Sequence, residues 1–408
     1  MKIRLVRICA LAHPYPDGSR LDTVVLQYDR AIRCRSVAED TFTVSGRSVV
    51  RAYTALRDER TDARRNGPFV ILELDPGNGQ GRTSHVEFLD RSCADPMSPP
   101  PMRRYRDPLP ISVVQKKPLT DAQGREYAPD GKRHVSTQTR YRIVEEFRQF
   151  SFRGLSCNLY IPKNIHAPLP LVLFLHDASA CGSDPLFTLL QGNGAVRFAD
   201  RQSQKKHPCF VLAPQIAEGD ILATDDFRVS RTLNIIRELI TDMERRYPVD
   251  PNRIYAAGQS MGCMAVCELI VRHPDLFAAS IAVAGSWDPG RMAQLKNPPL
   301  WIFVSQGDEK AYPGMNAVVR GMERTGSRIR RSRLLGSADP KILDARIRKI
   351  AAGTEQTRYT VFIGSSVVPP DVPVNPGAVH NWTWPIVYES QALKDWLFRQ
   401  VRPAKIRL

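Results

Sequence analysis

Long uninterrupted apolar runs are missing from this 408-residue sequence. No stretch approaches the roughly 18–20 apolar residues that a membrane helix needs, so we expect no membrane partner. The N-terminus is basic, but Arg4 and Arg7 interrupt it and leave too short an apolar run for a signal peptide. We therefore expect a cytoplasmic protein. The alternation of Ile3, Leu5 and Ile8 favours a first β-strand instead.

Paired cysteines are also missing. The eight cysteines are scattered along the chain, and none forms a Cys-x-x-Cys pair. This spacing argues against both a disulfide framework and a zinc site. Cys263 and Cys267 stand at i and i+4 of a predicted helix, where they are most simply small buried side chains. We expect neither a metal nor an organic cofactor.

Aromatic residues do not interleave with the densest basic stretch, residues 320–349, although the chain carries a net charge of +16. Single-stranded nucleic acid stacks on aromatic side chains, and this stretch offers no such platform. Apolar residues recur between its charges, as on amphipathic elements with one solvated face. We expect no nucleic-acid partner. Salt-dependent retention on DNA would support the alternative.

Short strand-like pieces separated by turn signals fill residues 1–93. The candidate strands are 23–28, 41–44, 49–54 and 69–74, with turns at Gly18, Gly46, Gly67 and the Asp75-Pro-Gly-Asn-Gly79 cluster. Repeated short strands without helical periodicity predict a small β-sandwich. Residues 96–118 are rich in proline, as in an irregular connection, with Ile111–Val114 as a candidate last strand.

The length of the chain favours two domains, and we place them at 1–118 and 119–408. If the chain forms a homo-oligomer, we expect the N-terminal domain to mediate it. In the second domain, apolar strand candidates alternate with helical patterns, which predicts an α/β fold with a mainly parallel sheet and helices on both faces. The expected strands are 155–161, 171–175, 209–213, 253–257, 278–284, 299–305 and 359–363, and the expected helices are 228–246, 261–272, 315–324, 340–351 and 390–398.

The strongest local signal is Gly258-Gln-Ser-Met-Gly262, which follows a predicted strand and opens an apolar helix. That context is required of a Gly-x-Ser-x-Gly nucleophile elbow and predicts an α/β-hydrolase fold with Ser260 as nucleophile. A sharp strand-to-helix turn would hold the serine hydroxyl above the sheet edge, at a helix N-terminus that favours a developing anion. Flanking glycines remove side chains that would collide there.

A serine hydroxyl needs a base, and this fold places the acid and then the histidine after the serine in the chain. Asp308 follows the predicted strand 299–305 and is the preferred acid, with Asp288 and Glu309 as competitors. His380 is the histidine that satisfies the order, in a predicted loop between the last strand and a C-terminal helix.

The oxyanion hole requires two backbone N–H groups. Met261 would supply one of them, and either Asp177 or Ala178, after strand 171–175, would supply the other. Gln259 and Trp382 are candidate substrate-binding residues. Trp382 and the nearby Trp384 are equally suited to packing the segment that carries His380.

Four motifs resemble those of esterases grouped with polyhydroxybutyrate depolymerases, feruloyl esterases and prolyl oligopeptidase-like hydrolases. They are Phe152–Pro162, His176–Gly182, Asp250–Gly262 and His380–Trp384. The resemblance covers about residues 150–400. A subset of these esterases carries an N-terminal immunoglobulin-like domain, to which residues 1–118 look similar.

One departure from that pattern concerns the oxyanion loop. The family usually has His-Gly where this sequence has His176-Asp177. A carboxylate aimed at the oxyanion would oppose catalysis by like-charge repulsion, so we expect Asp177 to turn its side chain away.

These features predict a serine carboxylic ester hydrolase that acts on a small-molecule ester through an acyl-serine intermediate. One alternative is a serine peptidase of the prolyl oligopeptidase-like type, although no blade-like repeat is present to restrict its substrates. A second alternative is a non-catalytic binding protein with a hydrolase fold, against which the intact order of serine, acid and histidine argues.

Overall fold

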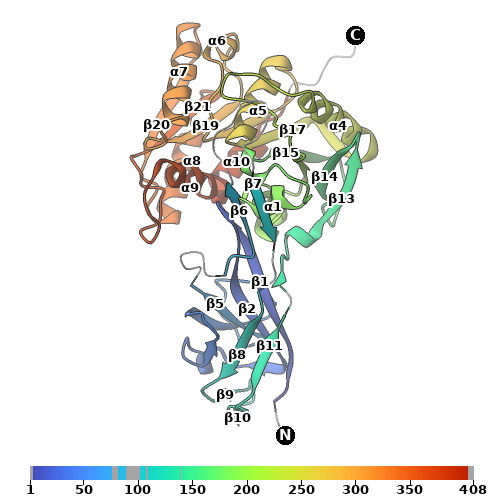
Figure 1. The fold of residues 1–408 in the computed structure, drawn as a ribbon, viewed down its shortest axis with the longest axis vertical. Helices are drawn as coiled ribbons and strands as arrows, with labels where there is room; N and C mark the ends of the chain where they lie inside the picture. The colour runs from blue at the N-terminus through green and yellow to red at the C-terminus, as the bar shows by residue number, and fades with distance from the viewer. Residues whose placement is uncertain (1–2, 76–80, 89–101, 107–108, 138, 403–408) are drawn as a thin grey trace. The chain divides into compact units, whose positions relative to one another are not determined.

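The computed structural model describes residues 3–75, 81–88, 102–106, 109–137 and 139–402 (Figure 1). The chain divides into two compact units, the first formed by Met1–His85 and Arg104–Glu145 and the second by Val86–Arg103 and Glu146–Leu408. Cys93, residues 96–101 of the proline-rich stretch and most of the turn cluster after Asp75 lie outside the described residues.

The first unit is a β-sandwich. Its larger sheet has the strand order β12-β1-β2-β5-β4 and its smaller sheet the order β11-β8-β3. The hairpin β9-β10 accompanies them, and the two-stranded sheet β6-β7 is divided between the two units. The strands are β1 Leu5–Tyr15, β2 Gly18–Ile32, β3 Phe42–Val44, β4 Val49–Ala55, β5 Gly67–Leu74, β6 Ser84–Phe88, β7 Met102–Arg106, β8 Ile111–Gln115, β9 Leu119–Thr120, β10 Glu126–Tyr127, β11 Arg133–Ser136 and β12 Thr139–Arg140.

Alternation of side chains along the strands builds the core of this sandwich. Val24 and Leu26 of β2 pack in one cluster with Phe42 of β3 and Val113 of β8, which belong to the smaller sheet. Val25, between the first two, points to the other face of β2 and joins a separate cluster. This period of two is the pattern from which the strands were predicted. The four candidate strands at 23–28, 41–44, 49–54 and 69–74 are confirmed.

The first unit extends beyond the predicted boundary at residue 118. Strand β11 pairs with β8 and strand β12 pairs with β1, so residues 119–145 complete the sandwich. The prediction of an irregular connection over 96–118 was wrong for β7, whereas the candidate strand Ile111–Val114 is confirmed as β8, although further strands follow it. Strands of two to four residues leave almost no periodic signal in a sequence, which is why proline composition misplaced the boundary.

The second unit is an α/β structure around a mixed sheet with the order β13-β14-β16-β15-β17-β18-β19-β21-β20 (Figure 1). Every pair of neighbouring strands from β16 to β20 in this order is parallel. The pairs β13–β14 and β14–β16 are antiparallel. The mainly parallel sheet is thereby confirmed. Its strands are β13 Phe147–Phe152, β14 Leu155–Tyr160, β15 Leu169–Leu175, β16 Phe210–Gln215, β17 Val249–Gln259, β18 Ala279–Val283, β19 Leu300–Ser305, β20 Ile329–Leu334 and β21 Thr357–Phe362.

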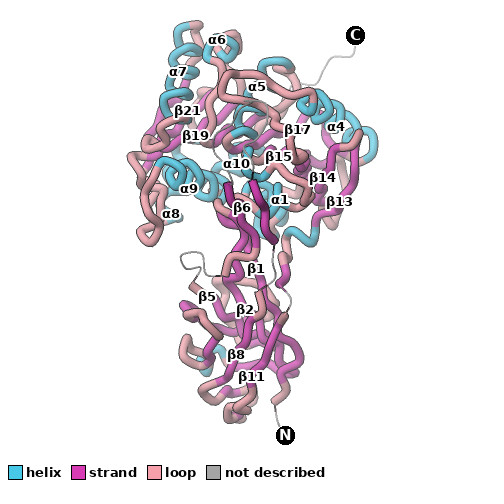
Figure 2. The backbone as a smooth tube through the Cα atoms, viewed as in Figure 1, coloured by secondary structure: helices cyan, strands magenta, loops and turns pink. Residues whose placement is uncertain are grey.

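Helices cover both faces of this sheet (Figure 2). Helices α4, α5 and α7 share one apolar core with side chains such as Leu173 and Ile302. On the other face, rings of α9 and α10 pack against Phe174, Tyr255 and Trp301. The helices are α1 Phe187–Leu190, α2 Gly194–Ala199, α3 Arg201–Lys206, α4 Thr232–Arg246, α5 Met261–Arg272, α6 Pro289–Met292, α7 Ala311–Arg324, α8 Pro340–Ala351, α9 Pro376–Glu389 and α10 Gln391–Arg399. Among the described residues, no helix combines the length and the apolar character needed to cross a bilayer.

Strand β20 lies within the basic stretch and was not predicted. Its sequence, Ile-Arg-Arg-Ser-Arg-Leu, has too few apolar residues to read as a strand. It forms the edge of the sheet, paired with β21 alone. Charged side chains are common on edge strands because they discourage pairing with other chains. Arg331 pairs with Glu323 of α7 at 2.8 Å, and Arg330 with Glu355 at 2.8 Å.

A buried lysine attaches α10 to its neighbours. Lys394 is 3% exposed, and its Nζ donates to the carbonyl of Arg197 at 2.8 Å and to Oγ of Ser203 at 2.7 Å. Asp200 Oδ2 lies 3.7 Å away. Burial lowers the pKa of Lys394 to about 8, against a partial opposing effect of Asp200.

This lowered pKa predicts a pH-dependent stability. Between pH 8 and 10.5 the unfolded chain holds the Lys394 proton that the folded chain has released, so stability should rise with pH in this window. The shift corresponds to about 3 kcal/mol in total. Lys394→Met should remove this rise, so the free energy of unfolding of wild type minus variant, from urea titrations, should increase from pH 8 to pH 10.5. A difference that stays constant with pH would contradict the prediction.

Candidate active site

The turn between β17 and α5 has the geometry of a nucleophile elbow. Ser260 has φ 52° and ψ −119°, in a region that residues other than glycine rarely adopt. A Cβ on Gly258 would lie 2.3 Å from the carbonyl oxygen of Gly262, and one on Gly262 would lie 2.0 Å from that of Leu175. Both flanking positions therefore exclude any side chain, as the sequence predicts.

Ser260, His380 and Asp308 lie within hydrogen-bonding reach of one another. His380 Nε2 is 2.9 Å from Ser260 Oγ, and His380 Nδ1 is 2.6 Å from Asp308 Oδ2. Because the carboxylate can only accept, Nδ1 carries the hydrogen and Nε2 is left to accept from the serine hydroxyl. The structure thus brings together the three side chains chosen from the sequence.

His380 lies on a helix, and its predicted placement in a loop was wrong. Helix α9 begins at Pro376, and the side chain of Asn375 caps it by accepting the N–H of Ala378 at 2.9 Å. Asparagine at the N-cap followed by proline at the first helical position is a helix-start signal, and the sequence contains it. Trp384, one turn after His380, packs edge-on against the imidazole with ring centroids 5.5 Å apart.

Asp308 is held by the start of α7 as well as by the histidine. Its Oδ1 accepts the backbone N–H groups of Lys310 at 3.1 Å and Ala311 at 2.9 Å. Burial works to raise the pKa of Asp308, but the hydrogen bond and charge of His380, together with these two N–H groups, outweigh it and hold that pKa below its ordinary value. The group is therefore a carboxylate at neutral pH.

The two competing acids have other surroundings. Asp288 caps α6, where its Oδ1 accepts the N–H groups of Gly290 at 2.8 Å and Arg291 at 3.2 Å. Glu309 lines the cavity above Ser260. The contacts of the described residues join neither carboxylate to His380.

The loop after β15 approaches the helix that Ser260 begins. Met261 is the first residue of α5, so its N–H belongs to the helix N-terminus. Asp177 and Ala178 follow β15, whose last carbonyl contacts Gly262 closely. The carboxylate of Asp177 is buried and accepts hydrogen bonds from Ser179, Gln191 and Gln259, and none of its hydrogen bonds among the described residues is to Ser260.

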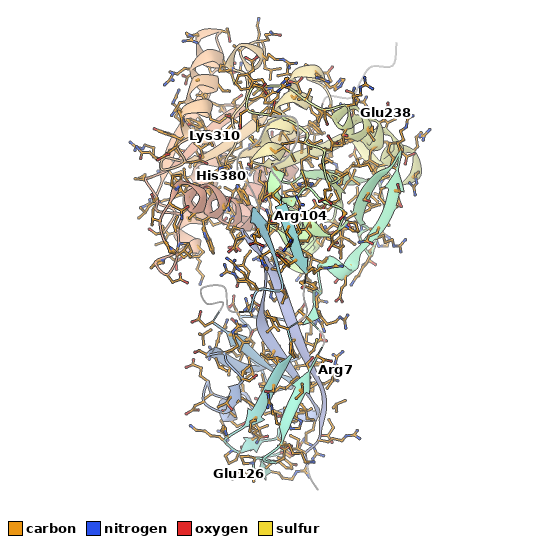
Figure 3. The ribbon with its side chains drawn as sticks, viewed as in Figure 1. Arg7, Arg104, Glu126, Glu238, Lys310 and His380 are labelled. Carbon is orange, nitrogen blue, oxygen red and sulfur yellow. The ribbon has the colours of Figure 1, made fainter. Side chains whose placement is uncertain are left out.

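A cavity of about 360 Å³ opens beside the nucleophile. Its size falls in the range of small-molecule sites. Small and apolar residues such as Met264, Ala284 and Pro376 form much of the wall. Lys310 and Asp225 also line it and form an ion pair with each other. Figure 3 labels Lys310 and His380, two side chains of this cavity.

The two predicted substrate-binding residues do not line this cavity. Gln259 is fully buried, and its Nε2 donates to Asp177 Oδ2 at 3.0 Å. Trp382 is two positions after His380 on α9, and residues at i and i+2 face different sides of a helix. Met264 lines the cavity instead, one turn after Ser260 on α5. That i, i+4 spacing was the sequence signal that could have found it.

Over the described ranges, no group of three or more histidine, cysteine, aspartate or glutamate side chains is arranged to hold a metal ion.

The fold and this arrangement define an α/β-hydrolase: a mainly parallel sheet, a serine elbow after a parallel strand, and serine, acid and histidine in that chain order. Residues 7–128 match the family model of the esterase Ig-like N-terminal domain. The chain therefore couples an α/β-hydrolase fold to an Ig-like domain of the kind that precedes esterases.

Comparison with solved and curated proteins agrees with this assignment. The crystal structure of a thermostable esterase matches 98% of this chain and 100% of its own, with a TM-score of 0.74 and 24% sequence identity. Poly(3-hydroxyalkanoate) depolymerase C of Paucimonas lemoignei is 22% identical over 176 residues, 38% of this chain. The match spans 40% of the length of that depolymerase. The N-terminal match, this relative and the shared fold support a carboxylic ester hydrolase.

Proposed function

We propose that this protein hydrolyses carboxylic esters through an acyl-Ser260 intermediate. The observation that carries the proposal is the continuous path from Ser260 Oγ to His380 Nε2 at 2.9 Å and from His380 Nδ1 to Asp308 Oδ2 at 2.6 Å. A serine is a weak nucleophile unless such a base takes its proton as the new bond forms.

In each half of the proposed reaction, His380 first accepts a proton and then donates one. It takes the proton of Ser260 as Oγ attacks the ester carbonyl, and gives that proton to the alcohol as the C–O bond breaks. Water then attacks the acyl-serine, with His380 taking its proton and returning one to Ser260 as the acid leaves. Asp308 holds the imidazole in the required tautomer and stabilises its cation.

The oxyanion of each tetrahedral intermediate would be bound by backbone N–H groups. Met261 supplies one of them in this proposal, and Asp177 or Ala178 supplies the second. Losing one such donor costs about 2.7–4 kcal/mol in the barrier, so the loop after β15 matters nearly as much as the three side chains. The cavity of about 360 Å³ favours esters with small or moderately sized acyl groups.

Covalent labelling tests this proposal directly. A fluorophosphonate should label the wild-type protein at Ser260, and Ser260→Ala should remove the label. Ser286→Ala is the matched control because Ser286 lines the same cavity, and this variant should still be labelled. Absence of labelling in the wild-type protein would contradict the proposal and favour a non-catalytic binding protein.

A substrate panel separates esterase from peptidase. We expect p-nitrophenyl and feruloyl esters to be hydrolysed with higher kcat/KM than any member of a peptide panel. The reverse order would favour a peptidase of the same fold. The Ser260→Ala protein, assayed beside the wild type, reports the background hydrolysis of each substrate.

A further inference from the structure

The buried carboxylate of Asp177 takes no part in the proposed reaction steps. It is 2% exposed and lies in the loop between β15 and the short 3-10 helix Ala178–Ala180. Its Oδ1 accepts the backbone N–H of Ser179 at 3.1 Å, the hydroxyl of Ser179 at 2.5 Å and Nε2 of Gln191 at 2.7 Å. Its Oδ2 accepts Nε2 of Gln259 at 3.0 Å. All four contacts require an acceptor.

These contacts join three segments that are distant in the sequence. Ser179 belongs to the 3-10 helix that Asp177 caps, Gln191 follows α1, and Gln259 is the last residue of β17, immediately before the nucleophile. Asp177 therefore ties the loop that would supply an oxyanion donor to the strand that presents Ser260. Charge-assisted hydrogen bonds of this kind are stronger than neutral ones and fix geometry.

The surroundings of Gln259 are shaped for this contact. Gly192 has φ +65°, and a Cβ there would lie 2.5 Å from Nε2 of Gln259. The amide oxygen of Gln259 is buried and has no hydrogen-bond partner among the described residues. The orientation of this amide therefore depends on its single donation to Asp177.

The histidine before Asp177 holds the same loop at its other side. His176 is fully buried, its Nδ1 donates to the carbonyl of Asp177 at 2.7 Å, and its Nε2 accepts the N–H of Ile216 at 3.0 Å. With both the backbone and the side chain of Asp177 held, the N–H groups of Asp177 and Ala178 have a fixed place relative to Ser260.

We propose that Asp177 is a positioning residue for the oxyanion hole, which its carboxylate sets by bonding the loop after β15 to Gln259. This inference rests on the proposed esterase function. In this role the carboxylate does not touch the substrate, and its charge is taken up by four donors rather than directed at the oxyanion. Loss of the bond should allow the second donor to move, which weakens stabilisation of the transition state more than binding of the substrate.

The test exchanges donor and acceptor between the two side chains. Asp177→Asn leaves an amide that can bond Gln259 only as a neutral pair, after one of the two amides turns over, and Gln259→Glu places two carboxylates against each other. The double variant restores one donor and one acceptor with the wild-type charge. We expect each single variant to lose about 10- to 100-fold in kcat with KM changed by less than about 3-fold, and the double variant to recover at least about 10-fold.

Asp121→Asn is the matched control, because Asp121 is also buried and also accepts backbone N–H groups and a hydroxyl, from Gln123, Arg125 and Tyr127, but belongs to the first unit. Its kcat should remain at the wild-type value. Single variants that fold and retain wild-type kcat, or a folded double variant without recovery, would overturn the role of Asp177. A role in stability alone would lower Tm without this rescue of kcat, and it would also overturn the proposal.

A milder substitution tests the proposal if the Asp177 and Gln259 variants do not fold. Ser179→Ala removes the hydroxyl that donates to Asp177 and accepts from Gln191 Nε2, and it should reduce kcat about 3- to 10-fold. An unchanged kcat in this variant would overturn the proposal. The outcome is distinct from failure of the proposed function, in which the wild-type protein itself would neither hydrolyse esters nor react with a fluorophosphonate.

Discussion

Replacing Ser260 with alanine is expected to lower kcat for ester hydrolysis by about a million-fold, the loss seen when the nucleophile of a serine triad is removed. Without Oγ no acyl-enzyme can form, and His380 has no hydroxyl to deprotonate. The variant should still hydrolyse the ester about 10³-fold or more faster than the uncatalysed reaction in water. This residual rate would come from the oxyanion donors and from substrate binding alone.

The structure of this variant should be intact, because alanine keeps the Cβ that the elbow already accommodates. Steady-state kinetics with a p-nitrophenyl ester measure the loss, and Tm checks the fold. Ser156→Ala removes an exposed hydroxyl from β14 and should leave kcat unchanged. Turnover by Ser260→Ala near the wild-type rate would refute the assignment of the nucleophile.

Asp308→Asn is expected to lower kcat by about 10⁴-fold. Two backbone N–H groups, of Lys310 and Ala311, already occupy Oδ1 of Asp308. An asparagine would keep its amide oxygen there and turn its NH₂ group toward His380 Nδ1. The histidine would then place its hydrogen on Nε2, facing Ser260, where it could no longer accept the serine proton.

The two competing acids, Asp288 and Glu309, provide controls for this prediction. Asp288→Asn should retain kcat and the cap of α6, because asparagine caps a helix about as well as aspartate. Glu309→Gln removes a charge from the cavity wall and should alter kcat far less than Asp308→Asn does. A loss in either control as large as that in Asp308→Asn would mean that the acid has been misassigned.

The features that the sequence predicts well are those with a local physical cause. The Gly-x-Ser-x-Gly elbow is such a feature, because a Cβ on Gly258 would meet the carbonyl of Gly262 within the turn itself; the contact of Gly262 with Leu175 adds a distant segment. Helices α4 and α7 each bury one regular stripe, which periodicity reveals, whereas α5 is buried along most of its length. The chain order of serine, acid and histidine then selects Asp308 and His380 without any knowledge of distances.

Other features depend on contacts that a single segment does not encode. Strands β11 and β12 are stabilised by their partners β8 and β1, so their own residues show little pattern. Gln259 was assigned to substrate because it adjoins the nucleophile, yet its side chain points toward Asp177. The direction of a side chain at the end of a strand depends on what packs beneath it. A cytoplasmic location and assembly through the N-terminal domain stay predictions.

The closeness of Gly262 to the carbonyl of Leu175 has a consequence for engineering this protein. With no room between the two backbones, Gly262 admits no substitution that could change the preference for one ester over another. Such tuning is left to the cavity walls contributed by Met264, by the turn after β18 and by the first residues of α9. Libraries of substitutions in these walls should change which acyl group fits, while the atoms of Ser260, His380 and Asp308 keep their positions.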